Sequence, residues 1–167
     1  MLLRLRANKE GSAARRPGRE PVPIRSLASM APTMQAGLSV GLHYELAVDS
    51  FFGASHSMRP EGEVHTHSFR LQATFIADAV DDQGMMVGFR EVNQMLEFEA
   101  KRYSNRYLND LEPFTIIQPT GENIAAVIYR NLHVGIAETM PFGPRLVAVT
   151  LWENPTSYVR VGGGQER

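Results

Sequence analysis

The chain has 167 residues, a length typical of one domain and sufficient to bury a hydrophobic core. It contains no cysteine, which excludes disulfides, thiolate metal sites and a cysteine nucleophile, and is compatible with a reducing cytoplasm. The net charge of −1 is the sum of a basic first segment and a mildly acidic remainder, and the acidic remainder is unlike a protein that binds nucleic acid. The sequence has no apolar run of about 18 residues, so no membrane span is predicted.

The first segment, residues 1–37, is rich in Arg, Pro, Ala and Ser and lacks a sustained hydrophobic period. It is therefore predicted to be a disordered N-terminal extension. This segment is either translated, in which case it could serve in targeting, or it precedes the true start of translation at Met30 or Met34. A single domain is expected over residues 38–161, followed by a frayed, Gly-rich tail over residues 162–167.

Two strands are predicted next, each from alternation of apolar and polar residues. In LHYELAVDSFFGASH, residues 42–56, most even positions are apolar, whereas the odd positions include His43, Glu45 and Asp49. In EVHTHSFRLQATFIADA, residues 63–79, alternate positions from Phe69 to Phe75 are apolar. This period of two is typical of half-buried strands.

The period then changes to that of two helices. GFREVNQMLEFEAKRY predicts a helix whose buried face holds Phe89, Val92, Leu96 and Tyr103, with Met95 and Glu99 at its edges. PTGENIAAVIYRNL predicts a second helix, capped by Thr120, with a buried stripe of Ile124, Ile128 and Leu132.

LVAVTLWENPTSYVRV predicts two final strands around a turn at Asn154-Pro155. The order ββααββ indicates an α+β fold in which two helices cover one face of an antiparallel four-stranded sheet.

Three histidines are expected to converge at one end of this sheet. His65 and His67 are separated by one residue on a strand, and share the core-facing parity of their apolar neighbours. His56 lies on the apolar parity of the first strand, so pairing of the two strands brings all three imidazoles together. Three neutral nitrogen donors suit a catalytic zinc, which polarises a substrate oxygen or lowers the pKa of bound water. Core histidines paired with carboxylates are the alternative.

The other two histidines are assigned ordinary roles. His43 falls on the polar parity of its strand and is predicted to lie on the surface. His133 follows the predicted helix, and is expected to cap its C-terminal end.

Four blocks, FGASH, HTHSFRLQATF, PTGEN and LWENPTS, in this order and spacing, resemble the 6-pyruvoyltetrahydropterin synthase family, which includes 6-carboxytetrahydropterin synthase. The resemblance covers residues 41–161. It implies a tunnelling fold, in which subunits join their sheets into a barrel, as a homohexamer of two stacked trimers. It also implies zinc on His56, His65 and His67, and a pterin ring anchored by Glu153, whose carboxylate can accept two parallel N–H bonds. A solvated strand-end carboxylate is the alternative for Glu153.

The chain departs from the family at the acid–base residues. The family's catalytic cysteine stands four residues before the His-x-His pair, where this chain has Glu61. The family's catalytic Asp-His pair is replaced by Ser104 and Asn105 in YSNRYLND. One branch of the family uses a glutamate three residues before the first histidine, but Gly62 fills that position. Glu61 or Glu63 remains a candidate acid/base, and a solvated loop carboxylate is the alternative for each.

These features predict a cytoplasmic zinc enzyme, of the lyase class, acting on a 7,8-dihydroneopterin (triphosphate)-type substrate in queuosine, pterin or folate synthesis. The residues expected to act are His56, His65 and His67 on the metal, Glu61 or Glu63 as acid/base, and Glu153 on the pterin. Thr120 is a candidate for the pocket wall, although a plain helix cap is the favoured explanation of this residue. The alternatives are a non-catalytic zinc-containing pterin- or purine-binding protein, or an enzyme that acts on another heterocycle. No nucleic-acid or membrane partner is expected.

Overall fold

The computed structural model describes residues 38, 40–58, 62–140 and 143–163. The predicted N-terminal extension lies outside these residues, as does the end of the predicted tail, whereas Gly162 is the last residue of a strand. The elements are β1 (Tyr44–His56), β2 (His65–Ala77), α2 (Phe89–Lys101), β3 (Arg106–Tyr107), the 3-10 helix η1 (Leu108–Asp110), α3 (Gly121–Thr139), β4 (Arg145–Asn154) and β5 (Ser157–Gly162).

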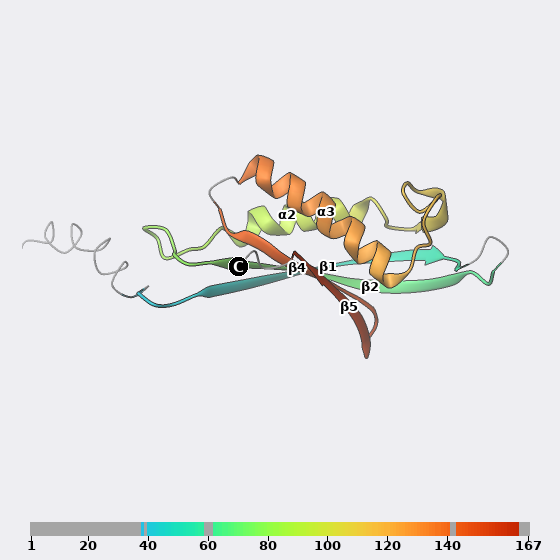
Figure 1. Ribbon diagram of the computed structural model, residues 1–167, viewed down its shortest axis with the longest axis horizontal. Coiled ribbons are helices and arrows are strands. Elements are labelled where there is room, and N and C mark those ends of the chain that lie inside the picture. Colours follow the sequence, from blue (N-terminus) through green and yellow to red (C-terminus); the bar gives the residue numbers. More distant parts are fainter. Residues whose placement is uncertain (1–37, 39, 59–61, 141–142, 164–167) are drawn as a thin grey trace, which may run out of the picture.

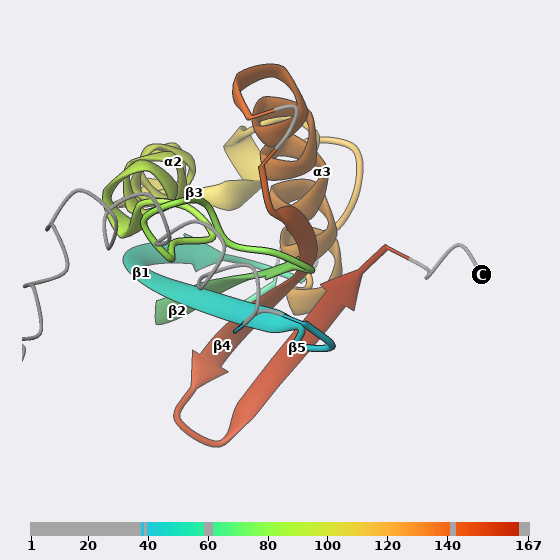
Figure 2. The same ribbon diagram turned by 90° about the vertical axis from the view of Figure 1, so that its left-hand side faces the viewer.

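The predicted α+β fold is confirmed. The strands form one sheet in the order β3-β1-β2-β4-β5, and α2 and α3 lie side by side on one of its faces (Figures 1 and 2). The four long strands are antiparallel, as expected, and the structure adds the two-residue β3, which pairs in parallel with the end of β1. Within the described ranges, no helix is long and apolar enough to cross a membrane.

β1 and β2 pair along their whole length, from Tyr44 opposite Ala77 to His56 opposite His65. Apolar side chains of both strands point to the helix face because strand residues alternate between faces. The innermost part of the core includes Phe69 and Leu71, which are 1% and 0% exposed. His56 and His67, near the ends of these strands, have the same parity as the buried residues and point to the same face.

The helices cover different parts of the sheet: α2 packs on β1, and α3 packs on β4 and β5. Thr120 caps α3 as predicted, since its side-chain oxygen accepts a hydrogen bond from the Asn123 N–H at 3.2 Å. The predicted stripe of Ile124, Ile128 and Leu132 is buried.

Two helix predictions were wrong. Phe89 is 62% exposed, because a helical period fixes where a side chain points but not whether another element lies there. His133 does not cap a helix end, because α3 continues to Thr139 and buries Ile136 as the next turn of its stripe. The His133 ring instead lies 5.8 Å from the ring of Tyr129, one turn earlier in the helix.

A buried carboxylate links the two helices. Glu99 of α2 is 4% exposed, and its Oε1 accepts hydrogen bonds from the Tyr103 hydroxyl and from Asn131 Nδ2 of α3, both at 2.7 Å. Arg102 donates to its Oε2 at 3.1 Å. Burial, and then the charge of Glu99, raises the pKa of Tyr103 above its ordinary value of 10.0.

We expect Leu71→Ala to lower the free energy of unfolding by about 2–5 kcal/mol, because it leaves a cavity in the centre of the core. Denaturant titration measures this loss. Val134→Ala, at a position 57% exposed on α3, serves as the control and should change it by less than about 0.5 kcal/mol. Equal effects of the two substitutions would contradict the assigned core.

The raised pKa of Tyr103 also predicts a loss of stability in alkali. The unfolded chain releases the Tyr103 proton near pH 10, whereas the folded chain holds it to higher pH, so this stabilisation is complete below about pH 10 and lost above it. Between about pH 9 and pH 11, the free energy of unfolding should therefore fall more steeply for the wild type than for Tyr103→Phe. Parallel curves from denaturant titration would show that Tyr103 is not the responsible group.

Candidate metal and substrate site

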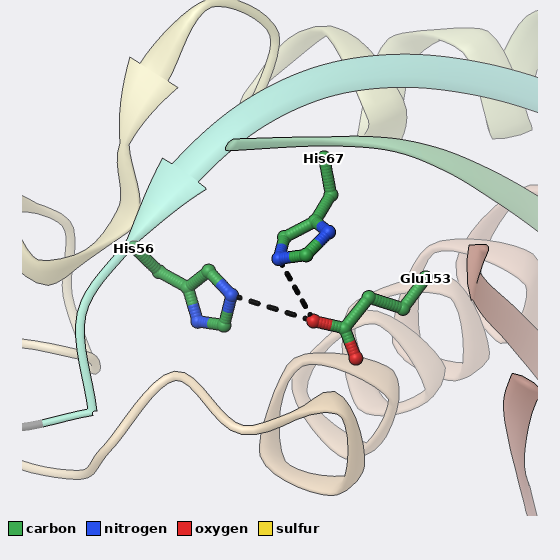
Figure 3. Close-up of side chains that lie close together, drawn as sticks. All are labelled: His56, His67 and Glu153. Carbon is green, nitrogen blue, oxygen red and sulfur yellow. Dashed lines mark ion pairs between the residues drawn. The ribbon is translucent and has the colours of Figure 1, made fainter. Parts of the chain in front are cut away.

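Two histidines and a glutamate meet at the end of the sheet. His56 is the last residue of β1, His67 lies near the start of β2, and Glu153 lies near the end of β4 (Figure 3). Glu153 Oε1 is 2.9 Å from His67 Nε2 and 3.6 Å from His56 Nε2. One donor atom from each residue lies within 4.8 Å of the other two, so this group could hold a metal ion.

The surroundings of His56 fix which of its nitrogens faces the site. Its Nδ1 lies 2.8 Å from the Pro119 carbonyl oxygen, just before α3. Because a carbonyl can only accept, Nδ1 carries the proton and Nε2 presents its lone pair. This Nε2 is buried and has no hydrogen-bond partner within the described chain. A buried acceptor without a partner is costly, whereas a metal ligand whose other nitrogen donates to a carbonyl is the usual arrangement of a metal-binding histidine.

The spacing of the rings also fits a metal. A zinc–nitrogen bond of about 2.05 Å places an imidazole centroid about 3.2 Å from the metal, so two imidazoles at a tetrahedral angle have centroids about 5.2 Å apart. The centroids of His56 and His67 are 5.2 Å apart. The centroid of the His65 ring lies 6.1 Å from that of His56 and 6.2 Å from that of His67. His65 is therefore adjacent but about 1 Å too distant, and its side chain is exposed.

The candidate acid/base residues lie in the connection between β1 and β2. Glu63 stands just before β2 and is exposed. Glu61 lies outside the described residues. Thr120 is committed to capping α3, immediately after the carbonyl that binds His56.

Two features of the site were not predicted from the sequence. The Pro119 carbonyl is a backbone group, and no side-chain pattern marks it as a partner of His56. The proximity of Glu153 to the histidines depends on the pairing of β4 with β2, in which Trp152 lies opposite Arg70. The resemblance of the LWENPTS block was the only signal for this residue.

The sequence and the fold match one known class of protein. Residues 45–164 match the family model described as 6-pyruvoyl tetrahydropterin synthase, and the chain belongs to this family. It is 31% identical over 124 residues to a 6-carboxy-5,6,7,8-tetrahydropterin synthase of Bacillus subtilis, a match that covers 69% of this chain and 82% of the relative.

Solved structures agree on the fold. The 6-pyruvoyl tetrahydropterin synthase of Caenorhabditis elegans superposes with a TM-score of 0.65 at 20% identity, covering 74% of this chain and 97% of that one. That of Plasmodium vivax gives a TM-score of 0.59 at 17% identity, covering 72% and 97%. At these identities, the likeness establishes the fold alone.

We expect His67→Ala to weaken binding of a divalent transition metal by at least about 100-fold, more than is typical when only an outer partner of a ligand is lost. Competition with a chromophoric chelator measures the affinity, and the visible spectrum of bound Co²⁺ reports on the ligands. His43→Ala is the matched control, since His43 is exposed and pairs with Asp78 at 2.8 Å. Unchanged affinity in His67→Ala would refute the assigned site.

Proposed function

We propose that this protein is a zinc-dependent enzyme that acts on a 7,8-dihydroneopterin-type substrate. The observation that carries the proposal is the buried Nε2 of His56, which has no hydrogen-bond partner among the described residues and faces His67 and Glu153 in a chain of the tetrahydropterin synthase family. Zinc held there would supply a Lewis acid for the oxygens of the pterin side chain.

The zinc ligands we propose are His56, His65 and His67, which leaves Glu153 for the pterin. His65 lies directly opposite His56 in the β1–β2 register, and its exposed ring would have to turn and move toward the other two to join them on the metal. The Glu153 side chain is 40% exposed, so a ligand can reach it from solvent. The two N–H groups on one edge of a pterin match such a carboxylate. Zinc on His56, His67 and Glu153 is the competing arrangement.

Proton transfer falls to Glu61 or Glu63 in this proposal. A carboxylate close to the metal can remove a proton from the carbon that bears the side-chain hydroxyl, provided that its pKa is tuned toward neutrality. A catalytic glutamate has a parallel in the family: the structure of the Plasmodium vivax synthase has also been solved for a variant with alanine in place of a glutamate described as a catalytic residue.

The product and the assembly are part of the same proposal. Because the Bacillus subtilis relative is a 6-carboxy-5,6,7,8-tetrahydropterin synthase, the first product to test for is a 6-carboxytetrahydropterin. This product would place the reaction in queuosine synthesis. The alternative products are 6-pyruvoyl and 6-hydroxymethyl pterins. We propose a hexamer of two trimers, because β5 forms an open edge of the sheet and closure into a barrel removes such edges.

A specific observation favours a second candidate, a zinc-containing pterin- or purine-binding protein without turnover. Ser104 and Asn105 stand where the family has its Asp-His pair, and neither can act as an acid or base near neutral pH. Both have structural roles: the Ser104 hydroxyl donates to the Ala100 carbonyl, and the Asn105 N–H donates to the Gly53 carbonyl at 2.6 Å. A third candidate is an enzyme that uses the same site on a different heterocycle.

The first test is anaerobic incubation of the zinc-loaded protein with 7,8-dihydroneopterin triphosphate, with the products identified by mass spectrometry. We expect Glu61→Ala or Glu63→Ala to lower kcat by about 10²–10⁴-fold, because one of them removes the acid/base group. Glu153→Gln should raise KM while the zinc content is unchanged.

Glu138→Ala, at an exposed position of α3, is the control and should retain full activity. Bound but intact substrate would refute an enzyme that acts on dihydroneopterin triphosphate, and would leave the binding protein or an enzyme that acts on another heterocycle. Loss of zinc in Glu153→Gln would instead make Glu153 a metal ligand.

A further inference from the structure

The segment after α2 contacts the residue that follows His56. Ser57 is 1% exposed and lies past the end of the β1–β2 ladder, whose last pair is His56 and His65. Its backbone groups therefore need partners other than a strand. The Asn109 side chain supplies both: its Oδ1 accepts from the Ser57 N–H at 2.9 Å, and its Nδ2 donates to the Ser57 carbonyl at 2.9 Å.

Further contacts fix the same segment against β1. The hydroxyls of Tyr107 and Ser57 are hydrogen-bonded at 2.7 Å. β3 pairs with Ala54 and Ser55, and Leu108 of η1 is fully buried in the core. Asn109 thus projects from a rigid support onto the peptide groups adjacent to His56.

His56 is consequently held from two sides. The Pro119 carbonyl binds its Nδ1, and Asn109 fixes the backbone on which the ring is mounted. With both ends fixed, the lone pair of Nε2 keeps its direction toward His67 and Glu153. A small rotation of the backbone at Ser57 would swing this nitrogen out of line, because the ring is only 4% exposed and has little space to compensate.

We infer that Asn109 is a positioning residue for the metal centre, acting through the Ser57 backbone on His56. This inference rests on the proposed function, since it requires that the site bind zinc. It explains what the second half of the YSNRYLND block does in a chain that has Ser104 and Asn105 in its first half: Tyr107, Leu108 and Asn109 support the metal site rather than carry protons.

The test compares zinc affinity in Asn109→Ala with that in Asn131→Ala, using the full chain and a competing chelator. Asn131 is matched because it is also partly buried and donates through Nδ2, but to Glu99 between the helices. We expect both substitutions to lower the Tm of the metal-free protein. Only Asn109→Ala should raise the zinc Kd, by about 10–100-fold, and change the visible spectrum of bound Co²⁺.

Each outcome of this comparison decides the inference. A zinc Kd for Asn109→Ala within threefold of the wild type overturns it and leaves the proposed function standing, whereas a wild type that binds no zinc overturns both. If Asn109→Ala fails to fold, Tyr107→Phe removes a single hydroxyl from the same support. A raised zinc Kd in that variant supports the inference, and an unchanged one overturns it.

Discussion

The register of β1 against β2 is the constraint on which the rest of the structure depends. It places His56 opposite His65, with His67 on the same face two residues later. A slip of one residue would turn the whole apolar face of either strand toward solvent, so burial of the core residues fixes the register firmly. The histidines thus inherit their positions from the hydrophobic core, and the site needs no separate device to align its two strands.

The strands and helices could be predicted from the sequence because their burial is one-sided and periodic. Alternation indicated β1, β2 and the inward parity of His56 and His67, and Thr120 had the chemistry of a cap. What escaped prediction depends on tertiary placement. β3 has only two residues and no period, and the buried Glu99 accepts a hydrogen bond from Asn131 of the other helix. The tautomer of His56 depends on a backbone carbonyl, which no side-chain pattern encodes.

The retained and the altered residues of the family pattern lie on different elements: the histidines on β1 and β2, and Ser104 and Asn105 after α2. The groups around His56 are packed, hydrogen-bonded and built on strands, so their geometry is set when the domain folds. Ser104 and Asn105, which stand where the family has its acid–base pair, lie in the turn after α2, and Asn105 has a φ of 57° that an asparagine tolerates better than most residues. This turn leads from α2 to β3. In the proposed reaction, proton transfer falls to Glu61 or Glu63, in the connection between β1 and β2.

The distances along the chain between the site residues have a consequence for folding kinetics. His56 and Glu153 are about 100 residues apart in sequence, and joining such distant points restricts the unfolded chain far more than it restricts the folded one. In the competing arrangement, in which Glu153 is a metal ligand, an ion would act as a reversible cross-link between β1 and β4. Opening of the domain would then wait for release of the ion, so the lifetime of the native state, and its resistance to proteases, would follow the availability of metal in its surroundings.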